Sequence, residues 1–143
     1  MTDPILTARG CRWIAVPGAA DKRGSINFLE YGKGLDFPVK RAFWWHHIAP
    51  GQWCGRHGHR LNSLVLVAMT GGCLVHLDDG GFKESMVLND PARALLIAPF
   101  VWHELTDFAE GSVILVMASG LYDEYDYLRD YEEFKRLVAT RAS

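Results

Sequence analysis

The stretch Gly51-Gln52-Trp53-Cys54-Gly55-Arg56-His57-Gly58-His59 carries two histidines separated by a single residue. On a β-strand this spacing directs both imidazoles to the same face, because successive side chains alternate. If that face lines the interior of a barrel, two groups that titrate near neutral pH share one cavity. Further along, Ala98-Pro99-Phe100-Val101-Trp102-His103 places a third histidine just past a predicted strand.

The segments around these histidines are short, apolar and rich in β-branched or aromatic residues, and glycine, proline, asparagine and aspartate separate them. This pattern is typical of strands joined by turns. The predicted strands are Cys11–Val16, Ser25–Glu30, Arg41–Ile48, Ser63–Thr70, Cys73–Asp78, Glu84–Leu88, Ala94–Ala98 and Ser112–Ser119. Asp78-Asp79-Gly80-Gly81 predicts a hairpin turn. The nearly continuous apolar runs Ser63–Met69 and Val113–Met117 predict strands that are covered on both faces.

The chain changes character near its C-terminus. From about Asp126 it consists of helix formers, with apolar side chains at helical spacing from Leu128 to Val138. We expect one amphipathic helix of about 12 residues, with Asp126 as its N-cap. Many short strands followed by one helix predict an all-β barrel or jelly roll with one short C-terminal α-helix.

Composition limits the possible functions. The 143 residues, 49% of them hydrophobic and 22% charged, suit a single globular domain over 1–143. A net charge of −2 gives no electrostatic basis for binding nucleic acid or an anionic membrane. Cys11, Cys54 and Cys73 form no paired spacing, which predicts reduced thiols in a cytoplasmic protein. We expect neither a signal peptide nor a transmembrane helix.

The histidine spacing resembles the first motif of the cupin superfamily, which has a glycine, five residues, His-x-His, a glutamate and a further glycine. The positions that fit are Gly51, His57, His59 and Gly71. Ser63 or Leu64 stands where the glutamate is usual. His103 matches the histidine of the second cupin motif, in which Phe100 replaces the usual glycine. The resemblance implies a cupin-type jelly roll, a fold that supports many reactions.

Three interpretations of the histidines stay open from spacing alone. Three neutral imidazoles can ligate iron, zinc or nickel, so a metal site is one of them. Acid/base catalysis without a metal is the second, because imidazole has a pKa near neutral pH. The third is a structural cluster that is hydrogen-bonded inside the barrel.

Further stretches form an ordered set along the chain. They are Asp21–Ser25, Pro38–Arg41, Gly55–His59, Leu77–Gly80, Ile97–Pro99, Trp102–Glu104 and the long run Ala118–Tyr131. With these stretches the sequence resembles the TDP-4-keto-6-deoxyhexose 3,4-ketoisomerases, small cupin enzymes that also occur as WxcM-like domains. The resemblance implies an isomerase that moves a carbonyl from C4 to C3 of a TDP-linked sugar through an enediol(ate). It implies no metal and no cofactor, with His57 as the base and His59 as its partner.

The resemblance also implies a substrate pocket that contains Arg23, Arg41, Phe43 and His103. Guanidinium groups suit a nucleotide diphosphate because their donors form a planar fork. In this family the residue at His103 helps to decide which face of C4 is protonated, and here Arg23 and His103 favour the galacto-like product. Phe43 stands where relatives often carry a tyrosine, so proton delivery would fall to a histidine or to water. The aromatic run from Phe43 to His47 is either core packing or a stacking floor for a base or sugar.

Two further positions depart from the family pattern, and two alternative functions remain open. Cys54 replaces a common arginine, and Gly58 replaces the usual alanine of His-Ala-His. The alternatives are a non-catalytic cupin that binds a sugar nucleotide and a three-histidine metal-dependent oxygenase. The family forms homodimers, some with exchanged N-terminal strands, and Thr2–Val16 is strand-like enough for this exchange.

Overall fold

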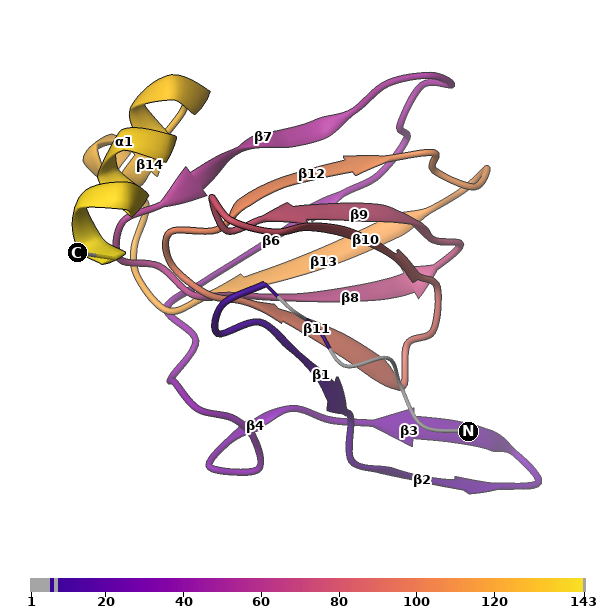
Figure 1. Cartoon of the computed structure of the whole chain (residues 1–143). Helices are drawn as coiled ribbons and strands as arrows, with labels where there is room; N and C mark the ends of the chain where they lie inside the picture. The colour runs from indigo at the N-terminus through magenta and orange to yellow at the C-terminus, as the bar shows by residue number, and fades with distance from the viewer. Residues whose placement is uncertain (1–5, 7, 143) are drawn as a thin grey trace.

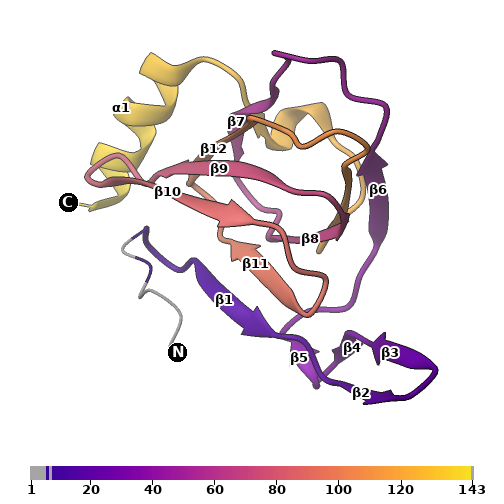
Figure 2. The ribbon, with the colours of Figure 1, turned by 90° about the vertical axis from the view of Figure 1, so that its right-hand side faces the viewer.

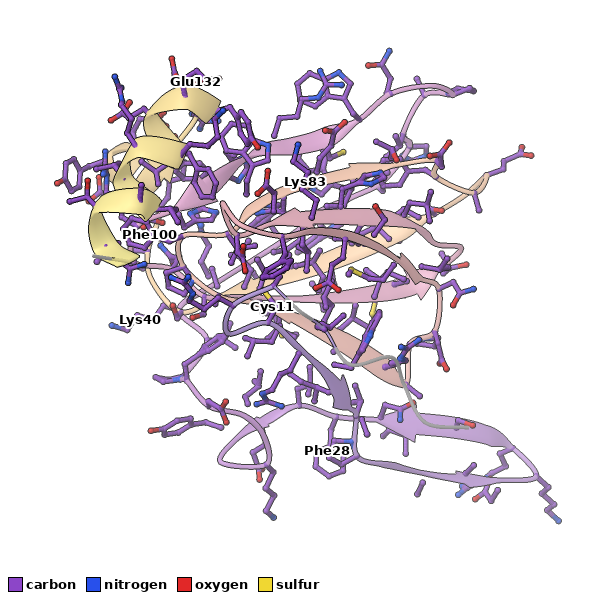
Figure 3. All side chains as sticks on the ribbon, in the orientation of Figure 1. Cys11, Phe28, Lys40, Lys83, Phe100 and Glu132 are labelled. Carbon is purple, nitrogen blue, oxygen red and sulfur yellow. The ribbon has the colours of Figure 1, made fainter. Side chains whose placement is uncertain are left out.

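The computed structural model describes residue 6 and residues 8–142, and its centre is a sandwich of two antiparallel five-stranded sheets (Figure 1). The first sheet contains β1 (Arg12–Ala15), β6 (Arg41–Trp45), β8 (Leu64–Thr70), β11 (Arg93–Ile97) and β13 (Val113–Ala118), in the order β1-β11-β8-β13-β6. The second contains β7 (Cys54–His59), β9 (Cys73–Asp78), β10 (Lys83–Leu88), β12 (Trp102–Thr106) and β14 (Tyr127–Leu128), in the order β10-β9-β12-β7-β14. Side chains fill the space between the sheets (Figure 3).

This architecture confirms the predicted all-β jelly roll. The turn at Asp79 is the expected hairpin between β9 and β10, because Asp79 N donates to Phe82 O at 3.1 Å. Strand β8 is buried on both faces from Leu64 to Ala68, as its apolar run predicts. Strand β13 instead alternates between buried and half-buried residues, so its second face is only partly covered. The strands predicted from the sequence did not include β7, β12 or β14, although the spacing of His57 and His59 was interpreted for the case that they lie on a strand.

A two-stranded ribbon projects away from the sandwich (Figure 2). It consists of β2 (Gly18–Asp21) and β3 (Gly24–Asn27), and all eight of these residues are exposed. The short strands β4 (Glu30–Tyr31) and β5 (Gly34–Leu35) follow it. The segment Thr2–Val16 is predicted to be able to exchange between the subunits of a dimer. Residues 2–5 and 7 of this segment lie outside the described residues. Strand β1, which also belongs to it, pairs with β11 of its own chain.

The C-terminal helix has the predicted length but begins later. Helix α1 (Tyr131–Ala142) spans 12 residues, and Asp130 Oδ1 caps it by accepting a hydrogen bond from Glu133 N at 3.0 Å. The assignment of Asp126 as the N-cap is therefore wrong. Asp126 ends a short 3₁₀ turn, η1 (Glu124–Asp126), and its side chain is buried. No helix in the described part of the chain is long and apolar enough to cross a membrane.

Helix α1 packs on one end of the sandwich through a small apolar cluster. Leu128, Phe134 and Val138 are buried there, and Trp102 packs against them. Gly58 lies directly under Phe134, so that an added Cβ would meet the Phe134 ring at 3.4 Å and the Val101 carbonyl at 3.2 Å. Glycine between the two histidines therefore lets the helix approach strand β7 closely.

We predict that Phe134→Ala lowers the free energy of unfolding by about 3–5 kcal/mol, because it empties a fully buried ring site. Urea denaturation monitored by circular dichroism measures this change. Phe82→Ala is the control, since Phe82 is 66% exposed and its loss should change stability by less than about 0.5 kcal/mol. Equal effects of the two substitutions would contradict the packing described for α1.

Candidate active site

A bulge in strand β7 aims His57 into the sandwich. The pairing with β12 shifts so that His103 faces His57 while Glu104 faces Gly55, which leaves Arg56 as the extra residue. Gly55 and Arg56 both have left-handed backbones, with φ of 89° and 61°. A Cβ at Gly55 would lie 2.9 Å from the His103 carbonyl, so glycine is required at this position. The bulge lets both Cys54 and His57 face inward although they are three residues apart.

The structure brings His57, His59 and His103 together, as the sequence predicts. The ring centroid of His57 lies 4.9 Å from that of His59 and 4.6 Å from that of His103. The rings of His59 and His103 are 5.8 Å apart. Tyr127 packs its ring against His57 at 4.9 Å and against His59 at 4.6 Å. The strand spacing thus does place the two β7 imidazoles on one face.

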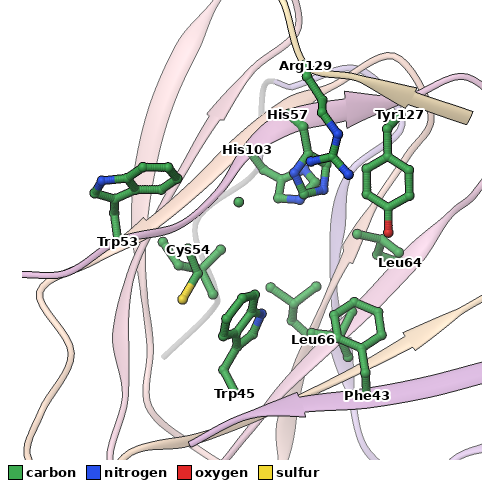
Figure 4. Close-up of a pocket in the computed structure, with 13 residues that line it drawn as sticks. Phe43, Trp45, Trp53, Cys54, His57, Leu64, Leu66, His103, Tyr127 and Arg129 are labelled. Atoms are coloured by element: carbon green, nitrogen blue, oxygen red, sulfur yellow. The ribbon is translucent and has the colours of Figure 1, made fainter. Parts of the chain in front are cut away.

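The rings of His57, His103 and Tyr127 border a cavity of about 310 Å³ (Figure 4), whereas His59 packs behind them and is not among the residues that line it. His57, His103, Tyr127 and Arg129 lie on one side of it, and Phe43 lies on the opposite side. The remaining lining residues are mainly apolar: Trp45, Trp53, Cys54, Gly55, Leu64, Leu66, Leu105 and Val116. A concave, largely apolar cavity with a few convergent polar groups is the usual form of a small-molecule site.

The segment from Asp126, the last residue of η1, to Arg129 supplies three side chains that were not predicted to belong to the site. Asp126 Oδ2 lies 2.6 Å from His59 Nδ1, and both side chains are buried. Tyr127 covers the two imidazoles, and the Arg129 guanidinium lies 4.4 Å from the Tyr127 ring centroid. All three belong to the long run that carries the family resemblance, which was the available signal. The helix-like spacing of the apolar residues from Leu128 onward led instead to the prediction of a helix that begins at about Asp126.

Burial keeps the imidazoles neutral. Desolvation, and then the neighbouring His59, lower the pKa of His57 to about 4. Desolvation also lowers the pKa of His59, although Asp126 opposes the shift, and it lowers that of His103 well below its usual value. Burial alone would raise the pKa of Asp126, but hydrogen bonds from Asn62, Leu61 and His59 lower it overall. At neutral pH the site therefore contains neutral imidazoles beside an ionised carboxylate.

Arg41 lies beside this cluster at the start of β6. Its Nη1 donates to the Tyr127 hydroxyl at 3.3 Å. Its Nε and Nη2 are buried and have no hydrogen-bond partner among the described residues. Buried donors of a charged group are costly to leave unpaired, so these two atoms suit an anionic ligand.

Neither Arg23 nor Cys54 belongs to the imidazole cluster. Arg23 lies at the turn of the β2–β3 ribbon, where its side chain is 85% exposed and pairs with Asp21 at 2.7 Å. Cys54 lines the cavity, but burial raises its pKa to about 11, which leaves the thiol protonated and a poor nucleophile. Within one chain, the pocket predicted from the sequence thus contains Phe43 and His103, lies beside Arg41 and lacks Arg23.

The three histidines could also hold a metal. One nitrogen atom of each lies within 4.8 Å of those of the others, and no second group of this kind occurs among the described residues. Neutral imidazoles suit zinc or iron. Leu64, one of the two residues at the usual glutamate position, lines the cavity as an apolar side chain, and the Asp126 carboxylate is bound to His59. The donor set is therefore limited to three imidazoles.

A jelly roll with clustered histidines in a cavity between its sheets defines a cupin-class protein. The family described as FdtA, WxcM-like, C-terminal, matches residues 9–139, and the chain belongs to this family. A TDP-4-oxo-6-deoxy-alpha-D-glucose-3,4-oxoisomerase from Aneurinibacillus thermoaerophilus is 40% identical over 119 residues, which cover 83% of this chain and 86% of the relative.

Solved structures agree with this assignment. A histidine-to-asparagine mutant of the 3,4-ketoisomerase QdtA from Thermoanaerobacterium thermosaccharolyticum, in complex with TDP-4-keto-6-deoxyglucose, is 31% identical with a TM-score of 0.90. The match covers 96% of this chain and 98% of that one. The WlaRB TDP-quinovose 3,4-ketoisomerase from Campylobacter jejuni is 35% identical with a TM-score of 0.85, covering 90% and 98%. The predicted family and enzyme class, an isomerase, are confirmed.

We predict that the protein loses stability as the pH falls from about 6.5 to about 4. Unfolded imidazoles bind protons in this range, whereas His57 stays neutral down to about pH 4, so the unfolded state gains protons first. Urea titrations across this range should give a shallower slope for His57→Gln, by at most about 1.4 kcal/mol per pH unit. His46→Gln is the matched control because His46 is exposed. Parallel curves for wild type and His57→Gln would refute the neutral, buried imidazole.

Proposed function

We propose that this protein converts a TDP-linked 4-keto-6-deoxyhexose to the 3-keto isomer by histidine acid/base catalysis. The observation that carries the proposal is the cluster of neutral imidazoles at a cavity in a member of the 3,4-ketoisomerase family. A base removes the proton from C3, the enediol(ate) forms, and a proton returns at C4. The two carbons exchange oxidation state internally, so no redox cofactor is needed.

The surroundings of the cavity suit a nucleotide-linked sugar. Arg41 offers two unpaired buried donors, and Arg129 lines the cavity, so cationic groups are available for a diphosphate or an enediolate oxygen. Trp45 and Trp53 line the cavity and are 43% and 45% exposed, so their indoles suit stacking on a base or sugar. The Arg56 guanidinium, 3.7 Å from the Trp53 ring centroid, already covers one face of that indole. We assign substrate contacts to Arg41, Phe43 and His103.

We predict that chelator-treated protein isomerises TDP-4-keto-6-deoxyglucose in D2O and incorporates deuterium at C4, as followed by NMR. The double variant His57→Asn/His59→Asn should lose turnover by at least ~10³-fold, because general-base catalysis is removed. His76→Asn is the control, since His76 bonds Ser85 and Thr106 outside the cavity and its loss should leave the rate unchanged.

Three outcomes separate this function from its alternatives. Nucleotide binding by calorimetry without deuterium exchange would indicate a non-catalytic cupin. Stoichiometric iron or a similar metal by elemental analysis, without isomerisation, would indicate the three-histidine metal-dependent oxygenase. Absence of turnover with several nucleotide-linked 4-keto sugars would refute the proposal. The configuration of the product at C4 tests the galacto-like outcome favoured by Arg23 and His103.

We further propose that the active form is a cytoplasmic homodimer in which the β2–β3 ribbon reaches the partner subunit. An isolated two-stranded ribbon is marginally stable in water, and this one is exposed along its whole length. Next to its base, Phe28, Val67 and Met117 border an apolar hollow of about 380 Å³ on the outer face of the first sheet. A second copy that covered this face would bury the hollow and could receive Arg23 at its own cavity.

We predict that a mixed dimer of Arg23→Ala and His59→Asn subunits regains activity although each parent dimer is impaired. If the ribbon acts across the interface, one of the two sites in the mixed dimer contains both intact residues. Co-expression with two different tags isolates the mixed dimer, and its rate should approach half that of wild type. A mixed dimer no more active than its parents, or a monomer by sedimentation, would exclude this arrangement.

A further inference from the structure

The Tyr127 hydroxyl has a donor but no acceptor among the described residues. Arg41 Nη1 donates to Tyr127 Oη at 3.3 Å. A guanidinium can only donate, so the phenol oxygen accepts in this contact and its own proton stays available. The ring is fixed by packing, with its centroid 4.9 Å from that of His57. The hydroxyl is therefore held in place with a proton that no described residue accepts.

This hydroxyl belongs to the cavity wall. Tyr127 lines the cavity, and Figure 4 shows its hydroxyl end directed toward the side on which Phe43 lies. The Arg41 guanidinium carbon is 5.3 Å from the Phe43 ring centroid, so one guanidinium lies beside both the hydroxyl and that ring. Among the described residues that line the cavity, Tyr127 alone carries a hydroxyl group. A sugar bound there would therefore meet a single protein hydroxyl.

The proposed reaction moves two protons, and a base accounts for only one of them. The base transfers a proton from C3 to C4, whereas a second proton must leave the C3 oxygen and reach the C4 oxygen. The neutral imidazoles that line the cavity are suited to the first transfer, because each has a nitrogen that can accept. Burial raises the pKa of Cys54 to about 11, so its thiol does not readily give up a proton. The transfer between the oxygens needs another group.

We propose that Tyr127 is a further catalytic residue, whose hydroxyl carries the proton between the oxygen atoms at C4 and C3 of the bound sugar. The proposal rests on the proposed function and deepens it. Arg41 takes part by placing a positive charge beside the oxygen that transiently loses its proton. Without a tyrosine at position 43, the sequence predicts a histidine or water in proton delivery, and the structure offers Tyr127 in addition.

The steps balance without a co-reactant. As the base takes the proton from C3, the C3–H electrons form the C3–C4 double bond. The carbonyl electrons move to the C4 oxygen, which takes the Tyr127 proton and leaves a phenolate beside Arg41. The phenolate then removes the hydroxyl proton of the C3 oxygen as the C3 carbonyl forms, and the double-bond electrons take a proton at C4 from the protonated base. Tyr127 and the base thereby return to their starting states.

The test compares Tyr127→Phe with Tyr125→Phe in the isomerisation of TDP-4-keto-6-deoxyglucose. The first substitution removes the hydroxyl but keeps the ring that packs on the imidazoles. We expect its kcat to fall on the order of 10²–10³-fold with KM changed by less than about threefold, because proton transfer is lost and binding is kept. Tyr125 is 70% exposed, so Tyr125→Phe is the matched control and should keep kcat within about twofold of wild type.

A second hydroxyl from the opposite side of the cavity provides a rescue. The double variant Tyr127→Phe/Phe43→Tyr carries a phenol beside the same guanidinium, since Arg41 lies next to both rings. It should recover at least about tenfold of the kcat that Tyr127→Phe loses. A merely structural role of the Tyr127 hydroxyl would not produce this recovery.

A binding measurement that does not depend on turnover separates this inference from the proposed function. In protein with ¹³Cζ-labelled tyrosine, the Tyr127 resonance is identified by its absence from Tyr127→Phe. It should shift on saturation with TDP-6-deoxyglucose, which has no carbonyl to isomerise, and shift less with TDP alone.

Absence of this shift, or an equal shift with TDP alone, would overturn the inference even if the enzyme is active. Equal kcat values for Tyr127→Phe and wild type would also overturn it while leaving the proposed function intact. Absence of turnover by the wild-type protein would instead refute the proposed function and the inference with it.

Discussion

The hydrogen bond between His59 and Asp126 joins the two parts of the chain that form the site. Strand β14 has only two residues, and it pairs with β7 through Tyr127 opposite His59 and Leu128 opposite Gly58. Such a short strand provides little pairing energy, so the buried carboxylate and its donors hold the C-terminal segment on the sandwich. Because His59 is neutral, the contact is a hydrogen bond to a carboxylate, and leaving a buried polar group without its partner typically costs about 1–3 kcal/mol. The same contact therefore determines how the chain closes and how the imidazole is oriented.

Backbone conformation around His57 and His59 reinforces this arrangement. Arg56 precedes His57 in a left-handed conformation, and Phe100, also left-handed with φ of 59°, donates its N–H to His59 O at 2.7 Å. A non-glycine residue in this conformation costs about 1–2 kcal/mol. Phe100 stands at the motif position where glycine is usual, and its ring packs on the helix cluster with the Arg141 guanidinium 3.8 Å from its centroid. Packing thus offsets strain at a residue that positions the end of β7.

The sequence determined the parts of this structure that depend on local periodicity. Alternation along β9 and β10 and the Asp-Gly turn between them were sufficient to predict a hairpin, and the two-residue spacing of His57 and His59 was sufficient to predict a shared face. Asp126 shows where such reasoning fails. A helix N-cap and a buried acceptor require the same residue type, and the choice depends on His59, which is 67 residues away.

The other differences have similar physical causes. The bulge at Gly55 and Arg56 depends on the register with β12, which the sequence of β7 alone does not contain. Arg23 matched a family stretch, but its position on a projecting ribbon away from the imidazole cluster depends on tertiary structure that the stretch does not contain. The unpredicted strand β12 follows a left-handed Phe100, which the pattern Ala98–His103 does not reveal.

Burial of the imidazoles has a direct consequence for the proposed reaction. Exposed histidines would be partly protonated near neutral pH and would attract the diphosphate of the substrate while losing basicity. Here burial keeps them neutral, and permanent guanidinium cations remain available for anions. Arg129 is itself restrained by Glu124, whose pKa Arg129 and Tyr122 lower to about 2, so Glu124 stays ionised at neutral pH. In the proposed reaction, neutral imidazoles transfer protons and guanidinium groups bind anions, so the two tasks belong to different residue types.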